Sequence, residues 1–194
     1  MRLGSGLLGA LLFVTAGCSG GHVQSDSAPA PASSPTTTWP TASEPGKFAV
    51  SSPAFAEDKQ IPEEYSCDGR NVPPPLRWQN LPPGAESLAV VVDDPDAPAG
   101  LYVHWVVTGI PPSTTEIVSG TLPPAAVVSL NSANRAEYLG PCPPSGTGAH
   151  HYRFKLYALR QAPTLTPMTP ATESTTTIAD LSIAVTDTVG TFGH

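Results

Sequence analysis

Short apolar runs alternate with turn-forming segments along most of the chain, and this pattern predicts a mainly β protein. In the run 151–159, Tyr152, Phe154 and Leu156 alternate with Arg153 and Lys155, which is the period of a half-buried strand. Segments rich in Pro and Gly separate the runs, as expected for an antiparallel sandwich and not for alternating strands and helices. The strand-like runs are FAVSSP (48–53), PLRWQN (75–80), SLAVVVDD (87–94), YVHWVVTGI (102–110), AVVSLN (126–131) and HYRFKLYAL (151–159).

One helix is predicted near the end of the chain, over Ser174 to Asp187. Ile178, Leu181 and Val185 could share one face of such a helix, although the threonines within it are poor helix formers. The fold class expected from the pattern is therefore a β-sandwich with a short C-terminal helix.

The first residues have the features of an export signal. Residues 1–17 carry one positive charge at Arg2, then a short apolar run, then the small residues Ala16 and Gly17. Cys18 follows directly, in a pattern that resembles the lipobox of bacterial lipoproteins, so lipidation of Cys18 and a cell-membrane anchor are expected. The alternative is an ordinary secretory signal followed by an incidental cysteine.

Residues 18–46 are predicted to be a disordered tether, and residues 47–194 a single folded domain. The tether consists mostly of Ser, Thr, Pro, Ala and Gly, which offer little apolar surface to offset the entropy of ordering. The remaining length suits one domain with its own core.

Charge narrows the range of partners. The chain has a formal net charge of −7, with 9 Lys and Arg against 16 Asp and Glu, and the basic residues form no cluster in the sequence. This balance argues against nucleic acid and against direct binding of the domain to an anionic membrane surface. Contact with the membrane is expected through the lipid on Cys18.

Cys67 and Cys142 are the cysteines that remain in the exported domain. An even number in an exported protein favours a disulfide between them. The competing interpretation is a Cys142 thiolate with His150 as its base, which requires free thiols.

Three polar clusters follow or interrupt the predicted strands. Asp93, Asp94 and Asp96 follow one strand, His104 lies within the next, and the glycines of GTG precede His150, His151 and Tyr152. Adjacent strand residues face opposite ways, so only one of the two neighbouring histidines can join His104. A three-histidine metal site is therefore disfavoured; a site with two histidines and two aspartates stays open on chemistry alone. We predict no metal and no cofactor.

Several of these motifs together resemble the phosphatidylethanolamine-binding protein family, whose members are also called Raf kinase inhibitor-like proteins. The motifs are DDPDAP, VHWVVTGIP and GPCPPSGTGAHHYRFKLYAL, and YSCDGRNVPPPLRWQNLP is similar to the bacterial branch. The resemblance covers the domain from Phe48 onward and implies a Greek-key β-sandwich with a small ligand pocket at one end. By motif match, the pocket residues it implies are Asp94, Asp96, His104, Gly146, Gly148, His150 and Tyr152.

Two places depart from the family pattern, Gly109, where bacterial members usually have Asn, and the stretch SLNSANRAEYLGPCPP. These changes leave the pocket motifs intact and concern its rim, and with it ligand size or partner choice. The expected function is a non-enzymatic binding module for a small phosphorylated or other anionic ligand. The alternative is an inhibitor of an extracellular protein partner such as a protease. A hydrolase has little support, because Ser145 lies outside any nucleophile-elbow motif.

Overall fold

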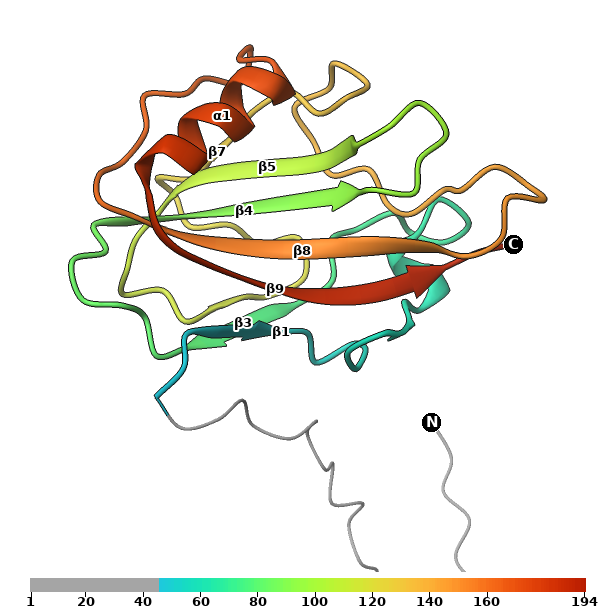
Figure 1. Cartoon of the computed structure of the whole chain (residues 1–194), viewed down its shortest axis with the longest axis horizontal. Coiled ribbons are helices and arrows are strands. Elements are labelled where there is room, and N and C mark those ends of the chain that lie inside the picture. The colour runs from blue at the N-terminus through green and yellow to red at the C-terminus, as the bar shows by residue number, and fades with distance from the viewer. Residues whose placement is uncertain (1–45) are drawn as a thin grey trace, which may run out of the picture. The chain divides into compact units, whose positions relative to one another are not determined.

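The computed structural model describes residues 46–194, which form two packed β-sheets with one helix (Figure 1). The predicted signal (1–17), Cys18 and all of the predicted tether except Gly46 lie outside the described residues. The smaller sheet has the order β1 (Ala49–Ser51), β3 (Leu76–Gln79), β6 (Glu116–Ile117). The larger sheet has the order β2 (Lys59–Gln60), β9 (Ser182–Phe192), β8 (His150–Leu159), β4 (Ser87–Asp94), β5 (Tyr102–Ile110), β7 (Val127–Val128). A short 3-10 helix, η1, spans Glu63–Tyr65.

Four strands of the larger sheet form a Greek key. β4, β5 and β7 are neighbours in that order, and β8 returns by a long connection to pair with β4 on its other side. All of these pairings are antiparallel, whereas β2 and β9 pair in parallel. The mainly β, Greek-key fold expected from the sequence is confirmed, with this one parallel pair added.

The main core lies between the two sheets. Every second residue of β4 and β8 faces inward, including Val90, Val92, Phe154 and Leu156, and packs against Trp78 and its neighbours on the smaller sheet. This explains the alternation read from the β8 sequence, in which Arg153 and Lys155 are only partly buried.

The other face of the larger sheet is covered by α1 (Ala171–Leu181), as Figure 1 shows. Ile178 of α1 is fully buried in a second apolar cluster with Val91 of β4 and Val106 of β5. Because β4 is covered on both faces, all eight of its residues are buried, which accounts for its continuous apolar run.

The predicted extent of the helix was wrong at its C-terminal end. The helix ends at Leu181, and residues 182–192 form β9, the longest strand in the described part of the chain. Ile183, Val185 and Val189 are β-branched, and β9 pairs with β8 along nearly all of its length, from Ser182 to Phe192. The free energy gained by pairing with β8 favours a strand here, although the spacing of the apolar residues also fits a helix. β-branched residues suit a pleated strand better than a helix. Of the predicted strand AVVSLN, only Val127 and Val128 have strand geometry.

Three strand ends meet at one end of the larger sheet. β4 ends at Asp94, β5 begins at Tyr102 opposite it, and β8 begins at His150. The polar residues singled out in the sequence therefore lie at one end of the larger sheet and in the loops beside it. Within the part of the chain that the structure describes, no helix is long and apolar enough to cross a membrane.

Candidate functional site

A cavity of about 470 Å³ opens at this end of the sheet. Its walls come from the ends of β4, β5 and β8, from the loop after β4, and from the segment before β8. The residues that line it are Cys67, Asn71, Asp94, Ala97, Pro98, Tyr102, His104, Arg135, Leu139, Gly140, Cys142, Pro143, Pro144, His150 and Tyr152.

A buried carboxylate–imidazole pair forms one side of the cavity. His150 Nδ1 lies 2.8 Å from Asp94 Oδ2, and the two side chains are only 4% and 5% exposed. The other carboxylate oxygen of Asp94 accepts the backbone N–H of Asp96 at 2.8 Å. Since Asp94 can only accept, His150 must carry a proton on Nδ1.

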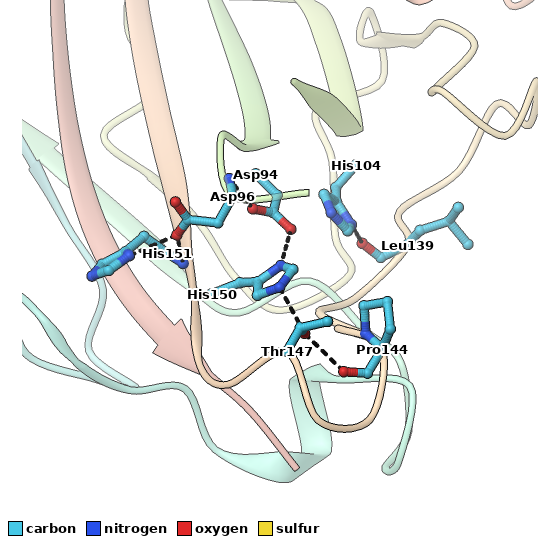
Figure 2. Close-up of polar contacts among 8 residues, drawn as sticks. All are labelled: Asp94, Asp96, His104, Leu139, Pro144, Thr147, His150 and His151. Atoms are coloured by element: carbon cyan, nitrogen blue, oxygen red, sulfur yellow. Dashed lines mark hydrogen bonds and ion pairs between the residues drawn. The ribbon is translucent and has the colours of Figure 1, made fainter. Parts of the chain in front are cut away.

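Thr147 completes this chain of contacts, as Figure 2 shows. Its hydroxyl oxygen lies 3.0 Å from His150 Nε2 and 2.8 Å from the carbonyl oxygen of Pro144. The hydroxyl can donate its one hydrogen to the Pro144 carbonyl while its oxygen stays within hydrogen-bond distance of Nε2, so Thr147 links His150 to the segment before β8.

His104 presents one free ring nitrogen to the cavity. Its Nδ1 donates to the carbonyl oxygen of Leu139 at 2.8 Å, and Nε2 has no hydrogen-bond partner among the described residues. Burial lowers the pKa of His104 below its ordinary value, against the opposing effects of the Leu139 carbonyl and the Asp94 charge. His104 is therefore neutral at neutral pH, and its Nε2 is an acceptor there, not a donor.

Tyr152 brings an unpaired hydroxyl to the same wall. The side chain is fully buried, and its oxygen has no hydrogen-bond partner within the described part of the chain. Burial first, and then the nearby Asp94 charge, raise the pKa of Tyr152; the backbone amide of Cys142 acts in the opposite direction without reaching hydrogen-bond geometry. The hydroxyl consequently keeps its proton. The rings of Tyr152 and His104 meet edge to face, with centroids 5.3 Å apart.

The Cys67–Cys142 disulfide and Asn71 hold another part of the cavity wall. The disulfide joins the loop after η1 to the segment before β8, as predicted from the cysteine count. Asn71 Oδ1 accepts the backbone N–H of Gly140 at 2.7 Å. The segment before β8 is thus fixed at two points, Gly140 and Cys142.

Some residues predicted for the pocket lie beside it instead. Asp96 does not line the cavity; its Oδ2 accepts from the backbone N–H and from Nδ1 of His151, at 2.8 and 2.7 Å, on the outer face of β8. These hydrogen bonds from His151 hold the pKa of Asp96 below its usual value. Gly146 and Gly148 are exposed, with φ of +86° and +84°, and shape the turn that brings Thr147 to His150.

Asp93 faces away from the cavity. Its carboxylate accepts from Arg153 Nε at 2.6 Å and from Lys155 Nζ at 2.7 Å on the outer face of β8. Of the three clustered aspartates, Asp94 is thus the one that lines the cavity.

Several residues of the site were not predicted from the sequence, among them Asn71, Tyr102, Thr147 and Arg135. No motif or strand pattern marks Asn71 as a site residue, and Tyr102 was predicted only to be part of a strand. Thr147 lies between the two glycines of the GTG motif, and the sequence predicted no contact for its hydroxyl. Arg135 belongs to the stretch that departs from the family pattern; it lines the cavity and forms an ion pair with Glu137.

The buried Tyr152 hydroxyl supports a testable stability prediction. We expect Tyr152→Phe to leave the free energy of unfolding unchanged or to raise it by about 1 kcal/mol, because the hydroxyl has no partner to lose. Urea unfolding checks this. A loss of more than about 1 kcal/mol would show that the hydroxyl is paired in the free protein.

These features define a β-sandwich protein with a cavity, lined in part by polar side chains, at one end of its larger sheet. The chain matches the model of the phosphatidylethanolamine-binding protein family over residues 51–192 and belongs to that family.

Relatives and solved structures agree with this assignment. A Mycobacterium tuberculosis protein named as a candidate lipoprotein, LppC, is 44% identical over 185 residues, covering 94% of this chain and 92% of its own length. A UPF0098 protein of Methanothermobacter thermautotrophicus is 46% identical over 111 residues, 55% of this chain and 72% of that protein. The crystal structure of Escherichia coli YbcL, titled a new member of the mammalian PEBP family, superposes with a TM-score of 0.73 at 29% identity, covering 76% of this chain and 98% of YbcL.

Proposed function

We propose that the chain is a membrane-tethered, extracytoplasmic binding module for a small phosphorylated or other anionic ligand. The observation that carries the proposal is the pair of unpartnered polar atoms, His104 Nε2 and the Tyr152 hydroxyl, on residues that line one cavity. A buried polar group without a partner costs free energy, so the unpaired Tyr152 hydroxyl in a cavity wall favours a ligand that pairs with it, and the neighbouring His104 Nε2 offers that ligand a second polar contact.

The protonation of these groups defines the ligand chemistry. Tyr152 can donate to an anionic oxygen, whereas neutral His104 can only accept. A ligand oxygen must therefore bring a proton to His104, or His104 must take one up as the anion binds. Arg135 is the one Lys or Arg side chain among the residues described as lining the cavity, and it brings a guanidinium, paired with Glu137, to the wall.

The tether and its lipid belong to the proposal as well. Residues 1–17 have the order of an export signal, and Cys18 follows the small residues at its end. The name of the mycobacterial relative describes a candidate lipoprotein, and its similarity covers 94% of this chain. Acylation of Cys18 would anchor the domain at the outer side of the cell membrane through residues 18–46.

We propose binding without turnover. Thr147 is the hydroxyl that faces His150, and its contacts to His150 and Pro144 hold the wall in place. Hydrolysis of simple phosphate esters by the purified chain, lost in Thr147→Val, would overturn this part of the proposal.

The test is calorimetric titration of the full chain, in mild detergent, with inorganic phosphate. We expect a single saturable site whose affinity falls about 10- to 100-fold in the double variant His104→Ala, Tyr152→Phe, because these two side chains supply the unpartnered polar atoms and hydrogen bonds to a charged partner contribute about 1.5–3 kcal/mol. His151→Ala is the matched control, since His151 lies on the outer face of β8, and it should bind like the parent chain. Folding of each variant is checked by near-ultraviolet circular dichroism.

Unchanged affinity in a folded double variant would contradict the pocket assignment. If that variant still formed a stoichiometric complex with a protease or another extracellular protein, the inhibitor alternative would replace the proposal.

Sulfate affinity should depend on pH, because sulfate itself does not titrate in this range. Its binding favours protonated His104, so affinity is highest at low pH and falls as pH rises above the lowered pKa of free His104, which is below 6.5. The decline is at most about tenfold per pH unit for one proton. Calorimetry with sulfate across this pH range measures the decline in affinity. If sulfate affinity fell as steeply with pH in His104→Ala, the pH dependence would belong to another titrating group.

A further inference from the structure

A second cluster of metal-ligating side chains lies at the outer edge of the pocket wall. Cys67, Cys142 and His194 each bring one ligand atom, and these atoms all lie within 4.8 Å of one another. All three residues are exposed. The two sulfurs are joined as a disulfide, which leaves them unable to bind a metal ion in this state.

The backbone brings these residues together independently of the disulfide. The N–H of Cys67 donates to the carbonyl oxygen of Pro141 at 3.0 Å, next to Cys142. His194 follows β9, whose last residue, Phe192, pairs with His150. The Phe192 and His194 rings meet edge to face, with centroids 5.9 Å apart.

Close packing at Gly193 also fixes the position of His194. A Cβ atom at Gly193 would lie 2.8 Å from Ala149 Cα, so this part of the chain lies directly against the segment that leads into β8. The imidazole therefore stays beside the cysteines when the sulfur–sulfur bond is broken.

Asp68 orients the histidine in the way that metal sites require. His194 Nδ1 lies 3.2 Å from Asp68 Oδ2, and while that contact holds a metal ion would bind the histidine through Nε2. The other oxygen of Asp68 is 3.8 Å from Cys67 Sγ. A carboxylate that holds the second nitrogen of a ligating histidine is a common feature of zinc sites and raises the basicity of the ligand.

We propose that reduction of the Cys67–Cys142 disulfide creates a zinc site formed by Cys67, Cys142 and His194, with Asp68 positioning the histidine. The reductant is a dithiol. One of its thiolates attacks a cysteine sulfur to form a mixed disulfide, and its second thiol displaces that cysteine. The dithiol is thereby oxidised to a disulfide, and Cys67 and Cys142 gain two electrons and two protons. Zn²⁺ then binds the two thiolates and Nε2, and the two thiol protons are released to solvent.

The ligand set selects this class of metal. Two thiolates and one imidazole suit Zn²⁺, which takes four ligands in a tetrahedron, and leave one position for water or another ligand. Exposure makes the disulfide accessible to a dithiol, and exposed disulfides are the more readily reduced ones. Because Cys67 and Cys142 also line the ligand cavity, loading the zinc site would move the pocket wall.

Cobalt is the spectroscopic probe for the test. The full chain is reduced with a phosphine, the phosphine is removed, and Co²⁺ is titrated in. We expect one equivalent to bind, with thiolate-to-cobalt charge-transfer absorption and the visible bands of tetrahedral Co²⁺, and one equivalent of Zn²⁺ to displace it. The disulfide form should show none of these bands.

Variants distinguish a metal site formed by Cys67, Cys142 and His194 from metal binding by the two cysteines alone. His194→Ala should weaken Co²⁺ binding at least tenfold, and Asp68→Asn should weaken it less. His151→Ala is the matched control, because His151 is also an exposed histidine held by an aspartate but lies outside the cluster; it should bind Co²⁺ like the parent chain.

Three results would overturn the proposal. These are no charge-transfer band in the reduced chain, equal binding in the parent and His194→Ala chains, and a reduced chain that stays unfolded by circular dichroism with Zn²⁺ present.

Discussion

Replacing Cys67 and Cys142 together by alanine is expected to lower the free energy of unfolding by about 3–5 kcal/mol. The disulfide joins positions 75 residues apart, and closing so long a loop removes a large amount of conformational entropy from the unfolded chain. Urea unfolding of the full chain, with the parent kept oxidised, measures the difference.

The matched control is Ser145→Ala, an exposed residue in the same loop, which should change the free energy of unfolding by less than about 0.5 kcal/mol. A double cysteine variant as stable as the parent would show that the loop is held by its other contacts, such as the one between Asn71 and Gly140.

The second large effect is expected at the buried pair of Asp94 and His150. Asp94→Asn should lower the free energy of unfolding by about 3 kcal/mol, because it removes one member of an ion pair whose side chains are almost fully buried. The same variant should lose phosphate affinity, since His150 then loses the partner that orients it.

Asp96→Asn is the control for this prediction. Asp96 and His151 form a histidine–aspartate pair of nearly the same length, 2.7 Å, but their side chains are 41% and 54% exposed. Solvent screens such a pair, so its loss should cost at most about 1 kcal/mol. Equal effects of the two substitutions in urea unfolding would contradict the distinction drawn between the buried and exposed pairs.

The strands could be predicted from the sequence because the spacing of their apolar residues follows which of their faces are buried. β4 reads as a continuous apolar run since both of its faces are covered, and β8 alternates since one face is partly open. The β9 strand could not be predicted in this way. Ile183 and Val185 are 42% and 56% exposed, so their spacing does not reflect a buried face, and pairing with β8 decided their conformation.

Sequence reasoning about the site was strongest where a residue lies on a strand. The expectation that only one of His150 and His151 could join His104 is confirmed, because adjacent residues of β8 face opposite sides. Residues on loops were harder to place. Asp96 was assigned to the pocket by motif, yet its partner is His151, and nothing in the sequence pairs Thr147 with His150.

The central claim is that the cavity binds a small anion through His104 and Tyr152. The most direct test is a nuclear magnetic resonance titration of the full chain, in detergent, with inorganic phosphate and with phosphorylethanolamine. We predict saturable shifts of the His104 and Tyr152 ring signals and of the Leu139 and Thr147 amides, with the His151 ring as the unshifted reference. Absence of saturable shifts at these positions with millimolar ligand would contradict the account.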